Sequence, residues 1–163
     1  MRIPFQVLVI PFRRTATGVE FAVMKRSDAD WWHFVAGGGE EGETPLQAAR
    51  RETREEIGVP SERLRILGEL TPLYIPPSNF CIYPAVAAAD GPLSFIPEAE
   101  EVAEVIEVPL DHLLDPANAH EETRTIRGET VSVPFYAHGG HKIWGATAMV
   151  LAEFLDILSR AGR

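Results

Sequence analysis

The chain has little cysteine, no long hydrophobic run and no excess of positive charge. Cys81 is the single cysteine among 163 residues, so an intramolecular disulfide and a zinc site built on several cysteines are excluded. We expect Cys81 to be a small buried hydrophobic residue. No apolar run approaches the ~18 residues of a membrane-spanning helix, and Met1–Phe5 lacks the features of a signal peptide. These absences favour a soluble, cytoplasmic protein with no membrane partner.

Basic residues are outnumbered, since 15 Lys and Arg stand against 24 Asp and Glu for a net charge of -9. A polymeric nucleic acid is therefore not an expected partner, because affinity for the phosphate backbone needs a basic surface. A small anionic substrate stays compatible, since it needs only a few local cations or a metal ion. The acids gather in runs at 40–43, 52–56 and 98–107, which is the first indication of a cation site.

The composition is that of an ordinary globular protein, with 45% hydrophobic and 24% charged residues. No repeat, low-complexity tract or long linker divides the chain, so we expect a single domain over residues 1–163. Strands are predicted at 5–10, 19–25, 33–35, 65–74, 81–89, 102–108 and 131–136, and a C-terminal helix at 143–159. Strands interleaved with helices indicate a mixed sheet with helices on its faces.

The clearest helix follows Thr44. Thr44 can cap the helix, Pro45 suits its first position, and Gln47 completes a capping box. Gly58 supplies the C-terminal stop and Pro60 lies just beyond it. These signals predict a helix of about thirteen residues between them.

This helix carries Glu52, Glu55 and Glu56, whose spacing places all three on one face. Like charges at this spacing repel, and a hard divalent cation such as Mg²⁺ or Mn²⁺ would offset the repulsion through oxygen ligands. The alternative is a solvated acidic face paired with neighbouring arginines. The glycine run 37–39 lies just before the helix, where the chain can approach a phosphate or metal closely.

Gly37, Glu43 and the segment RETREEIGV at 51–59 resemble, in type and spacing, the Nudix box of the MutT-like hydrolases. The signature covers 23 residues at fixed spacings. Thr53 stands where the pattern usually has an aliphatic residue, and Val35-Ala36 replaces the Pro-Gly more often seen before the box.

The resemblance implies an α+β fold, an α/β/α sandwich whose mixed, partly parallel central sheet is flanked by the box helix and the C-terminal helix. It also implies a pyrophosphohydrolase that uses Mg²⁺ or Mn²⁺ while water attacks a phosphorus of a diphosphate linkage. Glu52, Glu55 and Glu56 would be the metal ligands and catalytic acids, with the backbone carbonyl of Ala36 as a further ligand. The implied structural residues of the box are Gly37, Glu43, Arg51 and Gly58, with an ion pair between Glu43 and Arg51.

Many family members use another acid downstream of the box. Glu101 precedes a segment ending in Val-Pro-Leu and occupies the position that often supplies an extra ligand or base. Glu104 is the second candidate, Glu98 and Glu100 lie nearby, and a solvated loop is the alternative.

The identity of the substrate stays open, because different parts of the chain resemble enzymes with different substrates. The first half of the chain resembles enzymes for nucleoside or pterin triphosphates. The segments 108–110 and 143–148 resemble the coenzyme A pyrophosphatase branch, although the upstream coenzyme A signature is absent. A nucleoside triphosphate or nucleotide-linked metabolite is the first expectation, and coenzyme A or another ADP conjugate is the alternative. A non-catalytic nucleotide-sensing module is the third reading, but such modules usually lose box acids.

Several residues are candidates for contact with this small nucleotide-type substrate. Arg26 could meet a phosphate, with a surface ion pair as the alternative. Trp31 or Trp32 could stack a nucleobase, although at least one of them is expected in the core or at its rim. Phe80 and Tyr83 are weaker candidates.

The glycine pair 139–140 and the apolar strand 131–136 each suggest a further role. His138 and His141 flank Gly139-Gly140, which we interpret as a mobile substrate loop. The oligomeric state is open, with a homodimer through the apolar strand 131–136 as one option.

Overall fold

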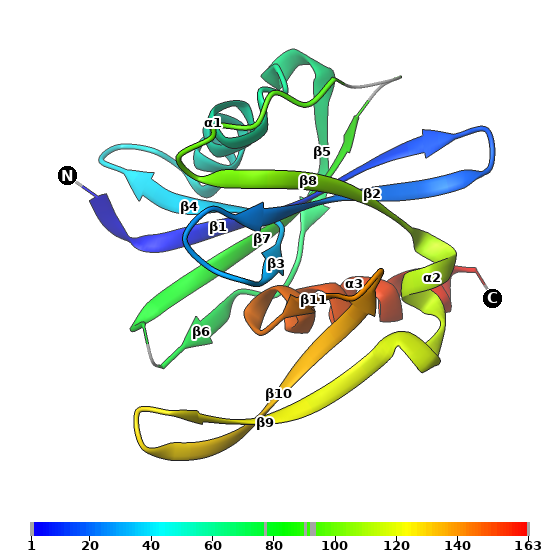
Figure 1. The fold of residues 1–163 in the computed structure, drawn as a ribbon. Helices are drawn as coiled ribbons and strands as arrows, with labels where there is room; N and C mark the ends of the chain where they lie inside the picture. The colour runs from blue at the N-terminus through cyan, green and yellow to red at the C-terminus, as the bar shows by residue number, and fades with distance from the viewer. Residues whose placement is uncertain (1, 77, 90, 92–93, 163) are drawn as a thin grey trace.

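The structure is a computed structural model that describes residues 2–76, 78–89, 91 and 94–162 (Figure 1). Its longer elements are β1 (Arg2–Thr15), β2 (Gly18–Arg26), β4 (Val35–Glu40), α1 (Pro45–Ile57), β5 (Leu64–Glu69), β7 (Phe80–Ala89), β8 (Val102–Pro109), β9 (Ala119–Ile126), β10 (Glu129–His138) and α3 (Ala146–Ala161). The short ones are β3 (Trp32–His33), η1 (Ser61–Arg63), β6 (Leu73–Ile75), α2 (Leu110–Leu114), η2 (Pro116–Asn118) and β11 (His141–Trp144).

The strands form a mixed sheet, with α1 on one side and α3 on the other (Figure 1). The central path runs β5-β7-β1-β2-β3-β11-β10-β9, while β4 pairs with β1 and β8 pairs with β2. The pairs β1–β7 and β3–β11 are parallel, and the other pairs are antiparallel. This arrangement confirms the predicted α+β fold with its partly parallel sheet.

Strand β1 is apolar on both faces because both faces are covered. Val7 and Val9 pack in the cluster that includes Ala48 and Ile57 of α1. Leu8 and Ile10 point the other way, as alternation along a strand requires, and pack in the cluster with side chains of α3. The sheet therefore separates two cores, and its α1 face carries the box residues.

Local signals predicted several elements but not all boundaries. The predicted strand 65–74 is divided into β5 and β6, and the one at 33–35 is the junction of β3 and β4. The C-terminal helix begins at Ala146, not at residue 143, because β11 comes first and Gly145 turns the chain with a φ of 67°. Strand β9 was missed, since its sequence AHEETRTI lacks apolar alternation.

Gly139 and Gly140 form a tight turn between β10 and β11, where His138 and His141 pair across the turn and both glycines have positive φ. The mobile substrate loop expected there stays a prediction. One smaller expectation is corrected. Cys81 is partly exposed rather than buried. Within the described ranges, no helix is long and apolar enough to cross a membrane.

Candidate active site

Helix α1 begins and ends where its capping residues predict. The Thr44 hydroxyl accepts from the backbone N–H of Gln47 at 3.3 Å, and the Gln47 side chain accepts from the backbone N–H of Thr44 at 2.8 Å. At the other end Gly58 is left-handed, with φ 67°, and its N–H donates to the carbonyl of Arg54 at 3.0 Å. Caps at both ends fix the position of the helix and of the acids that it carries.

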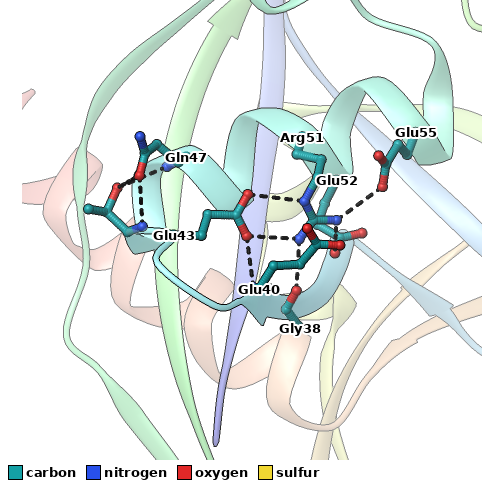
Figure 2. Close-up of polar contacts among 8 residues, drawn as sticks. Gly38, Glu40, Glu43, Gln47, Arg51, Glu52 and Glu55 are labelled. Atoms are coloured by element: carbon teal, nitrogen blue, oxygen red, sulfur yellow. Dashed lines mark hydrogen bonds and ion pairs between the residues drawn. The ribbon is translucent and has the colours of Figure 1, made fainter. Parts of the chain in front are cut away.

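Arg51 ties this helix to the segment before it (Figure 2). Its guanidinium donates to both carboxylate oxygens of Glu43 at 3.0 Å and to the carbonyl of Gly38 at 2.9 Å. It also reaches Glu52 at 2.8 Å and Glu55 at 3.0 Å. Hydrogen bonds from Arg51 lower the pKa of Glu43. The structure therefore contains the predicted Glu43–Arg51 pair, which joins β4, the 40–43 turn and α1.

Two of the three box acids are buried. The exposed fraction is 8% for Glu52 and 2% for Glu56, whereas the Glu55 side chain is half-exposed. One Glu56 oxygen accepts from the backbone N–H of Ala36 at 3.2 Å, and Oε2 has no partner. Burial, with the charges of Glu52 and Glu101, raises the pKa of Glu56 to about 8. A buried carboxylate oxygen without a partner is costly, so this site favours a bound cation.

Gly37 and Gly39 lie within β4 and allow close packing. A Cβ on Gly37 would lie 2.0 Å from Cδ of Glu52, and one on Gly39 would lie 2.2 Å from the ring of Phe5. The glycine run is thus extended strand rather than loop, and its missing side chains make room for Glu52 and Phe5.

The segment after β7 returns to the end of α1. The N–H of Ile96 donates to the carbonyl of Ile57 at 3.0 Å, and that of Glu98 donates to the carbonyl of Glu56 at 2.9 Å. The chain then turns, with the N–H of Glu101 donating to the carbonyl of Glu98 at 2.9 Å. This turn brings Glu101 close enough for its charge to raise the pKa of both Glu52 and Glu56.

A cavity of about 260 Å³ lies beside these acids. Its lining comprises Arg26, Ser27, Asp28, His33, Ala36, Glu56, Glu100 and Glu101. The Arg26 guanidinium holds the carboxylate of Asp28 through two hydrogen bonds of 2.6 Å. The same cavity is thus lined by a cation and by the acids Glu56, Glu100 and Glu101, a combination that suits a phosphate accompanied by a metal ion.

His33 was not singled out from the sequence. Its Nδ1 contacts the carbonyl of Phe34, Nε2 is buried without a partner, and burial lowers the pKa of the ring. A titratable residue four positions before the glycine run was the available signal.

The donor set of the site fits a hard divalent cation. Carboxylates of Glu52, Glu55, Glu56 and Glu101 are oxygen donors of the kind that Mg²⁺ and Mn²⁺ prefer. Among the described residues no three His, Cys, Asp or Glu side chains already form a metal-binding group. Glu52 and Glu55 are paired with Arg51 in this structure. The unpartnered Oε2 of Glu56 is the observation that fits the ion.

The NUDIX domain matches residues 4–128 of this chain. The chain belongs to the Nudix family. The human mitochondrial coenzyme A diphosphatase NUDT8 is 37% identical over 119 residues, covering 70% of this chain and 49% of the relative. The Nudix hydrolase NudL of Photorhabdus laumondii is 32% identical over 108 residues, covering 66% and 57%. This Nudix chain therefore spans about half the length of the curated relatives that it matches.

Solved Nudix structures share the fold. A Caenorhabditis elegans Ap4A hydrolase in a binary complex superposes with a TM-score of 0.65 at 20% identity, covering 95% of this chain and 98% of that one. At this identity the likeness concerns the fold alone, and it agrees with the sheet and helices described above.

The structure separates the predicted Nudix site residues into two groups. It brings Arg26, Ala36 and Glu101 to one cavity beside the box acids. Trp32 is a correction, because its side chain is 1% exposed in the core and cannot stack on a substrate.

The remaining candidates lie elsewhere. Phe80 opposes Ile75 in the β6–β7 pair, and Glu104 opposes Lys25 in the β2–β8 pair. Neither side chain is part of the cavity lining.

Proposed function

We propose that this Nudix chain is a pyrophosphohydrolase, dependent on Mg²⁺ or Mn²⁺, that cleaves the diphosphate linkage of a nucleotide-linked metabolite. The observation that carries the proposal is the buried, unpartnered Oε2 of Glu56 beside a cavity that also holds Arg26 and Glu101. All the box acids are retained, which speaks against a sensor that has lost catalysis. The cytoplasmic location expected from the sequence stays a prediction, since the human relative is named as mitochondrial.

The relatives favour the coenzyme A alternative over a nucleoside triphosphate. Human and mouse NUDT8, at 37% and 36% identity, are both named as coenzyme A diphosphatases. We therefore propose an ADP conjugate of the coenzyme A class as the substrate.

The proposed ligands are Glu52, Glu55, Glu56 and the carbonyl of Ala36, while Glu101 takes the alternative role of base. Bound Mg²⁺ or Mn²⁺ supplies Lewis-acid polarisation of the phosphorus–oxygen bonds and lowers the pKa of a nearby water. Arg26 orients the diphosphate by exchanging its contact with Asp28 for a phosphate oxygen.

We assign proton transfer to Glu101. Its carboxylate accepts a proton from the attacking water as the water oxygen bonds to phosphorus. The bond from that phosphorus to the bridging oxygen breaks, and the leaving phosphate keeps the electron pair. Arg51 takes no part in the transfer, and instead holds Glu52 and Glu55 in place through its hydrogen bonds.

The test is product release from coenzyme A, ADP-ribose, diadenosine polyphosphates and nucleoside triphosphates with Mg²⁺ or Mn²⁺. Wild type is compared with Glu56→Gln and Glu101→Gln, and with Glu62→Gln in η1 as an exposed control. We expect turnover of an ADP conjugate, a loss of at least about 10²-fold in the first two variants, and none in the control. Nucleotide binding without turnover of any compound would overturn the enzyme in favour of a sensor.

A further inference from the structure

A second cavity, of about 290 Å³, lies beyond the site described above. It is lined by Asp30, Trp31, Arg124, Lys142 and Trp144. These residues come from the loop before β3, from β9 and from β11, which the sheet brings together because β11 pairs with both β3 and β10 (Figure 1). The cavity therefore combines two tryptophans with two cations on a chain whose net charge is -9.

The rings of the two tryptophans pack against each other. Their ring centroids are 5.5 Å apart and their planes are inclined by 32°. Trp31 precedes β3 and is 43% exposed, whereas its neighbour Trp32, the first residue of β3, is 1% exposed in the core. An exposed tryptophan beside a cavity is a surface on which a flat ring can stack.

Trp144 is held in a fixed orientation by Glu122. The indole N–H donates to the Glu122 carboxylate at 3.1 Å, and the guanidinium of Arg124 lies 5.6 Å from the ring centroid. Lys142 and Trp144 are two residues apart on β11, so both project from the face opposite the buried Ile143. The ring is thus oriented before any ligand arrives, which lowers the entropy cost of stacking on it.

Two positive side chains at this cavity share a single carboxylate. Glu122 accepts from the Arg124 guanidinium at 2.8 Å and also contacts the Lys142 ammonium. Both cations are half-exposed, whereas Glu122 lies deeper, and Asp30 is paired with Lys25 at 3.1 Å. Two positive charges on one carboxylate leave one in excess at the rim, where an anion can reach it.

The loop between β2 and β3 joins the two cavities. Ser27 and Asp28 line the cavity beside the box acids, and Asp30 and Trp31 line the second one. A ligand with its diphosphate at Glu56 can therefore extend along this loop to the tryptophans.

We propose that the cavity lined by Trp31 and Trp144 is a second subsite for the same substrate, which takes an aromatic base carrying an additional phosphate. The base stacks on the exposed surface of Trp31, whose ring is already in contact with that of Trp144, and the additional phosphate binds Lys142 and Arg124. The inference rests on the proposed function and deepens it, because it requires a substrate with a phosphomonoester in addition to the diphosphate that is cleaved.

Binding of adenosine 3′,5′-bisphosphate and of AMP, followed by tryptophan fluorescence in EDTA, tests the subsite without catalysis. Wild type is expected to bind the bisphosphate about tenfold more tightly than AMP, since only the bisphosphate carries the additional phosphate. Lys142→Gln should reduce that preference to within about twofold, and Trp31→Ala should weaken both ligands about tenfold. Arg160→Gln on α3, which removes one exposed positive charge elsewhere, is the control and should bind as wild type does.

Hydrolysis separates this proposal from the proposed function. With coenzyme A as substrate, Lys142→Gln and Trp31→Ala should raise KM about tenfold and leave kcat unchanged, whereas Glu56→Gln should abolish turnover and keep bisphosphate binding. Equal affinity of wild type for AMP and the bisphosphate, or wild-type affinity in both subsite variants, would overturn the subsite even in an active enzyme. Binding that follows the expected pattern without turnover of any substrate would refute the proposed function and leave the subsite standing.

Discussion

Gly37 and Glu52 are in such close contact that a single methyl group cannot fit between them. A Cβ on Gly37 would lie 2.0 Å from Cδ and within 2.3 Å of both carboxylate oxygens of Glu52. The backbone of β4 thus forms the wall against which this buried acid is placed, and the position of the carboxylate depends on a side chain that is missing.

Gly37→Ala should therefore displace the Glu52 carboxylate. The end of a side chain moves more easily than backbone, so we expect the free energy of unfolding to fall by only about 1 kcal/mol. Hydrolysis should fall by at least about tenfold, because a displaced ligand misplaces the site. Urea denaturation and kcat/KM measure the two effects. Gly68→Ala, where nothing lies within 4 Å of the added Cβ, is the control, and full activity of Gly37→Ala would contradict the prediction.

Arg51→Lys should destabilise the fold as well as the site. A lysine keeps the charge but cannot span Glu43, Gly38 and the helix acids at once, because its donors share one nitrogen. Arg51 is 18% exposed, and we expect a loss of about 3 kcal/mol in the free energy of unfolding. Thermal and urea unfolding measure it. The matched change Arg54→Lys, at an exposed position of the same helix, should cost less than about 0.5 kcal/mol, and equal losses in both variants would refute the role of Arg51.

Metal should stabilise the wild type and not Glu56→Gln. Glu56 is the acid with an unpartnered buried oxygen, so its replacement by a neutral amide removes the reason for binding a cation. At a Mg²⁺ concentration of 100 times Kd, the free energy of unfolding should rise by about 2.7 kcal/mol in the wild type. Calorimetry with and without EDTA detects this increase. An equal rise in Glu56→Gln would show that the ion binds elsewhere.

His138 should make the protein less stable in acid. Its Nδ1 is buried without a partner, and burial followed by the charges of His112 and His141 lowers its pKa from 6.5. As pH falls through 6.5, the unfolded chain takes up a proton that the folded chain does not, so stability is present above this pH and is lost below it. His138→Phe should flatten the dependence of unfolding on pH between 7 and 5. His120→Phe, at an exposed ring stacked on Phe135, serves as the control, and an unchanged slope in His138→Phe would count against the assignment.

What could be predicted from the sequence were features governed by neighbours along the chain. Helix α1 was predicted because Thr44 and Gln47 cap its N-terminus and Gly58 caps its C-terminus. The shared face of the three box acids then follows from their spacing along the helix. The start of α3 was wrong because the apolar Ile143 continues the helical pattern while belonging to β11. The second cavity depends on a register that joins β3 to β11, and periodicity within one segment carries no information about such pairing.

The attachment of residues 96–98 to the last turn of α1 has a mechanical consequence. Glu56 and Glu101 come from opposite ends of a long excursion of the chain, yet both move with the same helix terminus. Because backbone hydrogen bonds join the two segments, we expect a displacement of that terminus to carry both carboxylates with it. The distance between the two acids is therefore set at one place in the fold, the C-terminal end of α1.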